Sequence, residues 1–393
     1  MTIKDRIDQL HEELIALRRD FHMYPELGFQ EFRTAEKVET YLHDLGLAPR
    51  RVAETGVTAA LEGGKPGPVF LLRADMDALP VQEENNVPYA SKTPGVMHAC
   101  GHDAHTAMLL AAAKVLCGIR EELPGTVKFV FQPNEEVAGA EIMVEQGVME
   151  DPRPEAAMAV HIWTPLAAGL IGVQNGPVMA GLEVFKITVH GKGGHTGYPE
   201  SAVDPIAAAA AIVQTVQTIQ TREVSLMTPT VIMFGKIQGG MKSNIIPDEV
   251  VLEGTIRFLY EGGPGSKEDP VGRLKRIAES VADVHRCTCT IETERENYAV
   301  INHPSMVQLI HDTAVEILGD ENKVVPHASM AGEDFSAFAS RVPAAFVFLG
   351  TGNPAKKTDY PHHNPRFNID EDVLPLGVEL LVKGAVNYLE KHS

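Results

Sequence analysis

The sequence has few cysteines, no long apolar run and a deficit of positive charge. Its 393 residues include only four cysteines, too few for a disulfide framework in a chain of this length. No run approaches the roughly 18 to 20 apolar residues of a membrane span. With 34 Lys and Arg against 53 Asp and Glu, the formal charge is −19. Because nucleic acids and anionic membranes bind basic surfaces, we expect neither as a partner.

The N-terminal segment lacks the apolar core of a signal peptide, since residues 1–22 carry charges throughout. We therefore expect a cytoplasmic protein. The remaining composition is ordinary for a globular chain, with 44% hydrophobic and 22% charged residues. The length allows two or three domains.

Potential metal ligands are concentrated in one short stretch, MHACGHDAH, at residues 97–105. Three histidines and a cysteine fall within these nine residues. Thiolate and neutral imidazole are preferred ligands of zinc and its borderline-soft neighbours. Cys100 and His102 form a Cys-x-His pair. A glycine-containing loop can direct the thiol and the imidazole toward the same point, where a metal could bind. The alternative is a chance cluster, which the density of ligand types disfavours.

The elements around this stretch alternate as in a doubly wound α/β domain. An amphipathic opening helix is expected over 3–18. Further helices are expected at 34–45, 106–116, 141–146, 306–318 and 373–391, and strands at 58–61, 69–73, 125–132, 156–162 and 345–349. Asp75 and Asp77 follow one of these strands, Glu135 and Glu136 follow another, and His161 lies near the end of a third. The carboxyl ends of strands are where α/β sheets bind ligands.

Between residues 181 and 295 the pattern changes to βαββαβ, which is typical of a ferredoxin-like domain. A loop is expected within it at 261–266. The α/β pattern resumes afterwards. We therefore predict a discontinuous catalytic domain, residues 1–180 and 296–393, with a second domain, 181–295, inserted between its halves.

The adjacent carboxylates Glu135 and Glu136 repel each other, so one is expected to be neutral, hydrogen-bonded or metal-bound. A metal ligand beside a general base suits hydrolysis. The plain alternative, two solvated acids in a turn, is equally common for such a pair. His161 alone would more often be a buried structural residue, and His362 and His363 could belong to a polar loop.

Taken together, these residues and the Cys-x-His pair supply five candidate ligands at the ends of successive strands. Two ions that share a ligand need about that many protein groups plus waters. Two metals a few Å apart polarise a carbonyl and lower the pKa of a shared water. The residues by themselves therefore predict a metal-assisted hydrolase.

Several segments together resemble the M20 metallopeptidase family, in particular its amidohydrolase branch of aminoacylases, hippurate hydrolases, N-acetyldiaminopimelate deacetylases and plant auxin-conjugate hydrolases. They span essentially the whole chain: RRDFHMYPELGFQE, RADMDALP, MHACGHDAHTA, FQPNEE, AVHIW, HGKGGHTGYPE, NIIPDE before GTIRF, AGEDFS and HHNPRF. The resemblance implies a zinc-peptidase-like α/β catalytic domain with an inserted dimerisation, or lid, domain. It also implies hydrolysis of an N-acyl-L-amino acid, of the N-acetyl or N-benzoyl type, to a carboxylate and a free amino acid.

The resemblance further assigns roles in the catalytic domain. The implied ligands of two divalent ions (zinc, manganese, cobalt or nickel) are Cys100, His102, Glu136, His161 and His363. His363 is chosen because the branch pattern is His-x-Pro followed by an aromatic residue, and His362 stays open as the alternative. Glu135 matches the general base. Asp75 and Asp77 are implied to orient ligand imidazoles.

In the inserted domain, His195 matches a histidine that reaches the scissile carbonyl in the partner subunit. An imidazole N–H can stabilise an oxyanion. Asn244 and Arg257 match groups that hold the substrate carboxylate, which Arg can bind bidentately. Glu333 is implied to line the pocket. The expected assembly is a homodimer, with a tetramer as the alternative, and the expected substrate is a small molecule. A di- or aminopeptidase of the same fold and a non-catalytic metal-binding protein remain the alternatives.

Overall fold

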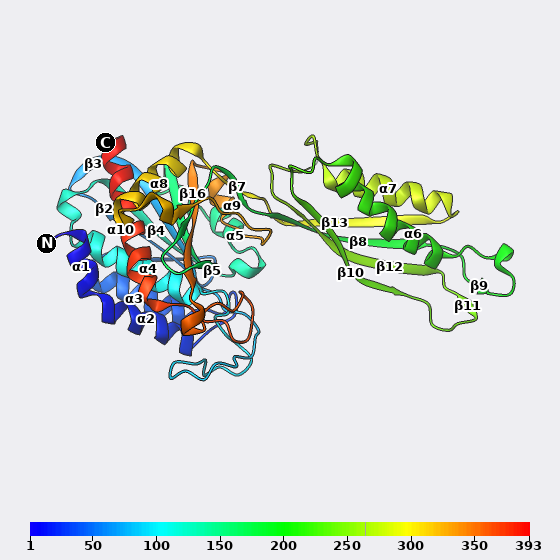
Figure 1. Cartoon of the computed structure of the whole chain (residues 1–393), viewed down its shortest axis with the longest axis horizontal. Coiled ribbons are helices and arrows are strands. Elements are labelled where there is room, and N and C mark those ends of the chain that lie inside the picture. The colour runs from blue at the N-terminus through cyan, green and yellow to red at the C-terminus, as the bar shows by residue number, and fades with distance from the viewer. Residues whose placement is uncertain (264) are drawn as a thin grey trace. The chain divides into compact units, whose positions relative to one another are not determined.

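The computed structural model describes residues 1–263 and 265–393, and the chain divides into two compact units (Figure 1). Unit 1 comprises Met1–Val178, Val300–Ala328 and Asp334–Ser393, and unit 2 comprises Met179–Ala299 and Ser329–Glu333. The loop expected at 261–266 includes Pro264, which lies outside the described residues.

Unit 1 is built on a mixed sheet of eight strands in the order β1-β2-β4-β3-β5-β16-β6-β15. The strands are β1 (Arg50–Val52), β2 (Gly56–Glu62), β3 (Lys65–Asp75), β4 (Pro124–Gln132), β5 (Ala156–Ala167), β6 (Ile171–Gly172), β15 (Val324–Val325) and β16 (Ala344–Gly352). The four central strands, β4, β3, β5 and β16, run parallel. Their carboxyl ends therefore meet at one edge of the sheet. Two short strands, β7 (Gly176–Met179) and β14 (Val300–Asn302), pair separately.

Helices cover this sheet. They are α1 (Ile3–Gln9), α2 (His11–Met23), α3 (Phe32–Asp44), α4 (His102–Cys117), α5 (Ala140–Glu145), α8 (Pro304–Leu318), α9 (Ser336–Ala339) and α10 (Leu374–His392). The single opening helix expected over 3–18 is wrong: two helices meet at Leu10, whose N–H closes a tight turn onto Ile7 O.

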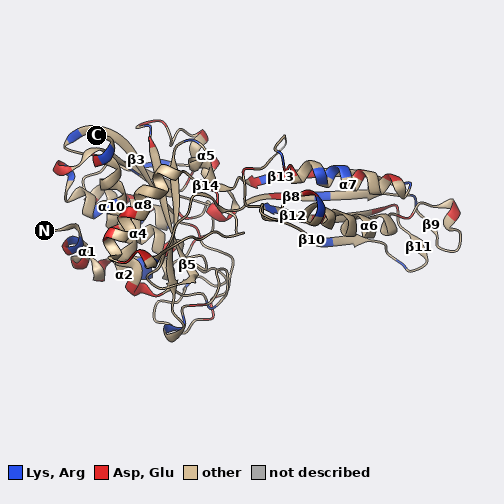
Figure 2. Ribbon diagram, turned by 45° about the horizontal axis from the view of Figure 1, so that its top comes forward, with Lys and Arg blue, Asp and Glu red and all other residues tan. Residues whose placement is uncertain are grey.

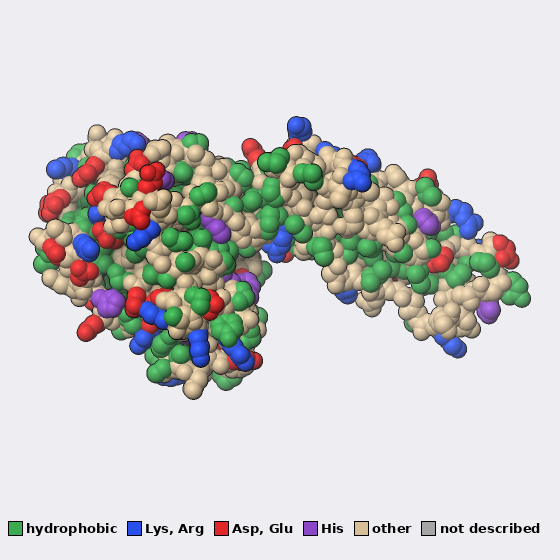
Figure 3. Space-filling model, in the orientation of Figure 1, with side chains coloured by type: hydrophobic (Ala, Val, Ile, Leu, Met, Phe, Trp, Pro, Cys, Tyr) green, Lys and Arg blue, Asp and Glu red, His purple; other side chains and the backbone are tan. Residues whose placement is uncertain are grey.

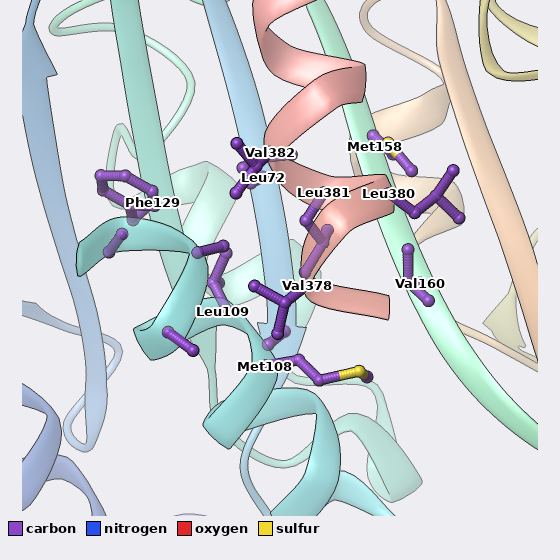
Figure 4. Close-up of a cluster of buried hydrophobic side chains, with 14 of the residues drawn as sticks. Leu72, Met108, Leu109, Phe129, Met158, Val160, Val378, Leu380, Leu381 and Val382 are labelled. Atoms are coloured by element: carbon purple, nitrogen blue, oxygen red, sulfur yellow. The ribbon is translucent and has the colours of Figure 1, made fainter. Parts of the chain in front are cut away.

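The main core lies where α4 and α10 pack on each other and on the central strands (Figure 4). Apolar side chains of the strands meet apolar side chains of the two helices. The contributing residues include Leu72 of β3, Phe129 of β4, Met158 of β5, Leu109 of α4 and Leu381 of α10, all essentially buried. Because α4 packs on the sheet along its length, its first turn lies at the carboxyl ends of the central strands.

Unit 2 has a four-stranded antiparallel sheet in the order β10-β12-β8-β13. Its strands are β8 (Gly181–His190), β10 (Thr230–Gly239), β12 (Glu249–Phe258) and β13 (Thr288–Asn297), and its helices are α6 (Pro205–Thr218) and α7 (Pro270–Val284). The helices begin at side-chain caps, Asp204 and Asp269, each followed by proline. The order of elements and of strands is the ferredoxin-like one expected from the sequence.

One face of the unit 2 sheet is covered by α6 and α7, whose apolar side chains form a second core with the strands. Figure 2 shows both basic and acidic residues along α7, and Arg273 and Arg276 of this helix pair with Glu223. A short pair of strands, β9 (Gly194–His195) and β11 (Ile245–Ile246), lies outside the main sheet. The mixed α/β fold class predicted from the sequence is confirmed. Among the helices that the structure describes, none has the length and apolar character to cross a membrane.

Candidate metal centre

The parallel strands bring together the polar residues that follow them. Asp75, at the end of β3, lies opposite Gln132 at the end of β4. Glu135 and Glu136 follow Gln132 in a short helical turn. His161 lies on β5, beyond the point where that strand pairs with β3. The acids and the histidine predicted from separate segments therefore share one edge of the sheet.

The loop that precedes α4 brings a cysteine and a histidine to the same edge. Gly101 lies between them with φ +91°, a left-handed conformation that favours glycine. A Cβ at this position would lie 2.3 Å from Cδ1 of Ile162 on β5, so the loop rests directly on that strand. The ligand atoms of Cys100, His102 and Glu136 lie within 4.8 Å of one another.

The remaining predicted ligands surround the thiol of Cys100. Its Sγ atom lies 3.7 Å from Nε2 of His161 and 3.7 Å from Nδ1 of His362. Nε2 of His363 lies 3.3 Å from Oε1 of Glu136. All five predicted ligands, together with the alternative His362, are therefore gathered around one point.

Nε2 of His102 is buried and has no hydrogen-bond partner among the described residues, whereas Oε1 of Glu136 lies 3.3 Å from Nε2 of His363. Leaving a buried polar atom unpaired costs about 1–3 kcal/mol. An imidazole nitrogen and a carboxylate oxygen are atoms that divalent metals bind. The donor set and the unpaired Nε2 of His102 therefore fit a metal ion.

Asp77 contacts two of the candidate ligands. Its Oδ1 accepts from Nδ1 of His102 at 3.1 Å, which leaves Nε2 as the ring atom that can bind a metal. Its Oδ2 accepts the backbone N–H of Glu136 at 3.1 Å. Asp75 instead accepts from His105 at 2.5 Å and from Arg73 at 2.7 Å, and lies 3.8 Å from His102.

The electrostatic surroundings separate the histidines into two groups. Burial holds the pKa of His161 well below its usual range and lowers the pKa of His362 to about 3, so both rings are neutral. Hydrogen bonds with Cys100 and Glu136 raise the pKa of His363 to about 10. A proton is therefore retained beside the thiol and the carboxylate, where a cation would be equally favoured.

A buried ion-pair cluster behind the ligand loop was not recognised from the sequence. Nε of Arg18 lies 2.9 Å from Oδ2 of Asp103, and Nη1 lies 3.1 Å from Glu371. Nδ1 of His22 lies 2.7 Å from the same Asp103 oxygen. Because Asp103 directly follows His102, these contacts fix the start of α4. The RRDFH segment that carries Arg18 and His22 matches the family pattern, but nothing in its local sequence relates it to Asp103.

Unit 2 carries its predicted site residues at two separate places. His195 pairs with Ile245 in the β9–β11 pair, and the N–H of Thr196 donates to Asn244 O at 3.3 Å, so His195 and Asn244 are neighbours. Both are exposed. Arg257 lies near the opposite end of β12, a strand of 10 residues or about 33 Å.

The end of β12 that carries Arg257 contacts the short segment that contains Glu333. The guanidinium of Arg257 donates to Met330 O at 3.2 Å. Glu333 is buried, and its carbonyl oxygen accepts from Nδ2 of Asn297 at 3.4 Å. Within unit 2, Arg257 and Glu333 therefore belong to one region, and His195 and Asn244 to another.

Comparison with known proteins agrees with these observations. The sequence profile described as peptidase family M20/M25/M40 matches residues 71–387. The chain belongs to this family. Thermostable carboxypeptidase 1 of Saccharolobus solfataricus is 36% identical to the M20 chain over 99% of its length and 98% of the relative. N-acetylcysteine deacetylase of Bacillus subtilis is 38% identical over 97% and 98%.

A solved structure is also similar to this M20 protein. It is a dinuclear metal-binding peptidase of the M20 family from Bacillus subtilis, with 34% identity, a TM-score of 0.84 and coverage of 98% of this chain and 99% of that one. The resemblance to M20 amidohydrolases noted in the sequence is confirmed. The chain is an amide-bond hydrolase of this family, with a metal-binding site and a small-molecule substrate.

Proposed function

We propose that this M20 enzyme hydrolyses N-acyl-L-amino acids, of the N-acetyl or N-benzoyl type, to a carboxylate and a free amino acid. The observation that carries the proposal is the position of Glu135 beside the ligand cluster, with Oε2 at 3.8 Å from Nε2 of His102. The names carboxypeptidase and deacetylase describe relatives that cleave an amide bond to an amino-acid nitrogen. This shared chemistry supports an acylated amino acid as the substrate.

The proposed ligands of two divalent ions are Cys100, His102, Glu136, His161 and His363, with zinc, manganese, cobalt and nickel as candidates. The backbone N–H of Thr164 donates to Nε2 of His362 at 3.4 Å. The proton of that ring therefore lies on Nδ1, toward Cys100, which favours His363 over His362 as the ligand. When bound, two such ions polarise the amide carbonyl and lower the pKa of a shared water.

Glu135 is the proposed general base. It accepts a proton from the attacking water and later delivers it to the leaving amine. Two left-handed residues, Asn134 at φ +52° and Ala138 at φ +60°, bracket the turn that carries it. This backbone shape lets adjacent side chains, Glu135 and Glu136, both reach the ligand cluster.

We further propose that unit 2, residues 181–295 in the main, is a dimerisation domain. On the edge strand β10, Met233 is 59% exposed and Ile237 61% exposed, and Met241 beyond it is 96% exposed. Figure 3 shows hydrophobic side chains along this part of unit 2. An exposed apolar edge strand is a favourable surface for a second copy of the chain.

A homodimer also accounts for the separation of the site residues within unit 2. His195 and Asn244 of one subunit would serve the metal centre of the partner, and Arg257 of one subunit would act beside Asn244 of the other. There His195 stabilises the developing oxyanion, and Asn244 and Arg257 hold the substrate carboxylate. Glu333 is proposed to line the same pocket.

Glu135→Gln tests the proposed reaction. The amide cannot accept a proton from water, so the variant should lose about 10²- to 10⁴-fold in kcat while it retains its metals. The assay uses acetyl-methionine and hippurate with Mn²⁺- or Co²⁺-reconstituted protein. Glu145→Gln, which neutralises an exposed acid of α5, is the matched control and should keep full activity.

Three outcomes would contradict the proposal. Retention of more than about a tenth of kcat in Glu135→Gln would remove its role as base. Faster cleavage of unblocked dipeptides than of N-acyl amino acids would indicate a peptidase. Metal binding without turnover of any of these substrates would indicate a binding protein.

A further inference from the structure

His105 lies between two strands that separate close to the metal centre. β3 and β5 are paired in parallel as far as Arg73 and Ala159. Beyond that pair the imidazole of His105, from α4, spans the gap between them. Its Nδ1 lies 2.5 Å from Oδ1 of Asp75 on β3, and its Nε2 lies 2.9 Å from the backbone N of Ile162 on β5. The imidazole ring therefore replaces the next backbone hydrogen bonds between the two strands.

The two contacts define where the ring proton lies. A backbone N–H can only donate, so Nε2 of His105 accepts from Ile162 and carries no proton. The proton is therefore on Nδ1 and is donated to the carboxylate of Asp75. Arg73 donates to the other oxygen of Asp75 at 2.7 Å and fixes that carboxylate. Although the ligand atoms of His105, Asp75, His102 and His161 lie within 4.8 Å, both nitrogens of His105 are already bonded.

Ile162, which His105 holds in place, also contacts the neighbouring candidate ligand His161. Nδ1 of His161 donates to the carbonyl oxygen of Ile162 at 2.6 Å. Nε2 of His161 therefore carries the lone pair and lies 3.7 Å from Sγ of Cys100. Both backbone polar groups of Ile162 are bonded to imidazoles, the N–H to His105 and the C=O to His161.

We propose that His105 is a positioning residue that holds the end of β3 and the middle of β5 at a fixed spacing and thereby orients His161 toward the metal. The inference rests on the metal site of the proposed function and adds a residue that neither ligates nor touches substrate. Partners that orient a metal ligand typically contribute 10- to 100-fold to metal affinity. The expected loss on removing His105 is of this size.

Two substitutions of His105 each retain one of its two contacts and remove the other. In His105→Gln the amide oxygen lies near the place of Nε2 and can accept from Ile162. In His105→Asn the amide lies near the place of Nδ1 and can reach only Asp75. We expect Co²⁺ affinity close to that of the wild type for the Gln variant and about 10- to 100-fold weaker for the Asn variant. Leu109→Ala, a core substitution on the same helix, provides a matched loss of stability with unchanged affinity.

Affinity is measured by titrating metal-free protein with Co²⁺ against a competing chelator, with the thiolate-to-cobalt absorption band as the signal. This readout does not depend on turnover. Loss in both His105 variants, with Leu109→Ala unaffected, would also support positioning through the pair of contacts. Equal affinity in all variants, or equal loss in Leu109→Ala, would overturn it. A wild-type protein that binds no Co²⁺ would instead overturn the proposed metal site itself.

Discussion

Each buried histidine of the metal centre has one ring nitrogen occupied by a protein partner. His102 uses Nδ1 toward Asp77, and His161 uses Nδ1 toward Ile162 O. In both rings the free nitrogen is therefore Nε2, which suits ligation because metal-bound imidazole must be neutral and correctly turned. Cys100 lies among these rings, and the chemistry of its thiol reports directly on the metal.

Metal should protect Cys100 from alkylation. Burial raises the pKa of this thiol, so the reaction with iodoacetamide is carried out at alkaline pH, where the thiolate forms without metal. Chelator-treated protein should lose activity and gain one reactive cysteine, mapped by mass spectrometry to Cys100. The free thiols Cys117, Cys287 and Cys289 are internal controls. Equal labelling of Cys100 with and without metal would contradict its role as a ligand.

The turn between β4 and α5 is held by the segment before α3. The carboxylate of Glu31, fully buried, accepts the N–H of Asn134 at 2.9 Å and the hydroxyl of Thr55 at 2.6 Å. Gly28 lies so close that a Cβ there would be 1.9 Å from Oδ1 of Asn134. The backbone that presents Glu135 is therefore anchored by residues about a hundred positions earlier in the chain.

Glu31 should make stability depend on pH. Burial raises its pKa from 4.5 to about 7. Between those values the unfolded chain releases a proton that the folded protein keeps, so the folded state loses stability as pH rises, by up to about 3 kcal/mol. Glu31→Gln lacks this titration. It should therefore gain stability relative to the wild type between pH 5 and pH 8, measured by urea unfolding.

Glu36→Gln, on the exposed side of α3, is the control and should follow the wild type at both pH values. A difference between Glu31→Gln and wild type that stays constant with pH would show that Glu31 is ionised in the folded protein across this range.

At the level of the assembly, the separation of His195 and Arg257 along unit 2 predicts an active site shared between subunits. His195→Ala should lose about 10²- to 10³-fold in kcat, as expected for loss of an oxyanion donor. Mixing this variant with Glu135→Gln under subunit exchange should restore about half of the wild-type activity per heterodimer. One site then holds both residues intact, as in the trans arrangement.

Exchange is verified with differently tagged subunits, and each variant mixed with itself should stay inactive. No recovery in the verified heterodimer would place His195 in the site of its own chain or outside catalysis.

The sequence by itself determined the classes of element and the chemistry of the ligands. Short apolar runs predicted strands that lead to Asp75 and Glu135 and one that carries His161, although β5 continues to Ala167. The spacing of Cys100 and His102 marked a metal loop. The sequence could not determine which partner each of these side chains would have. The contacts of Asp103 with Arg18, and of His105 with Ile162, join residues that no local pattern relates. Only the tertiary structure decided them, because strand register and burial set which polar groups must satisfy one another.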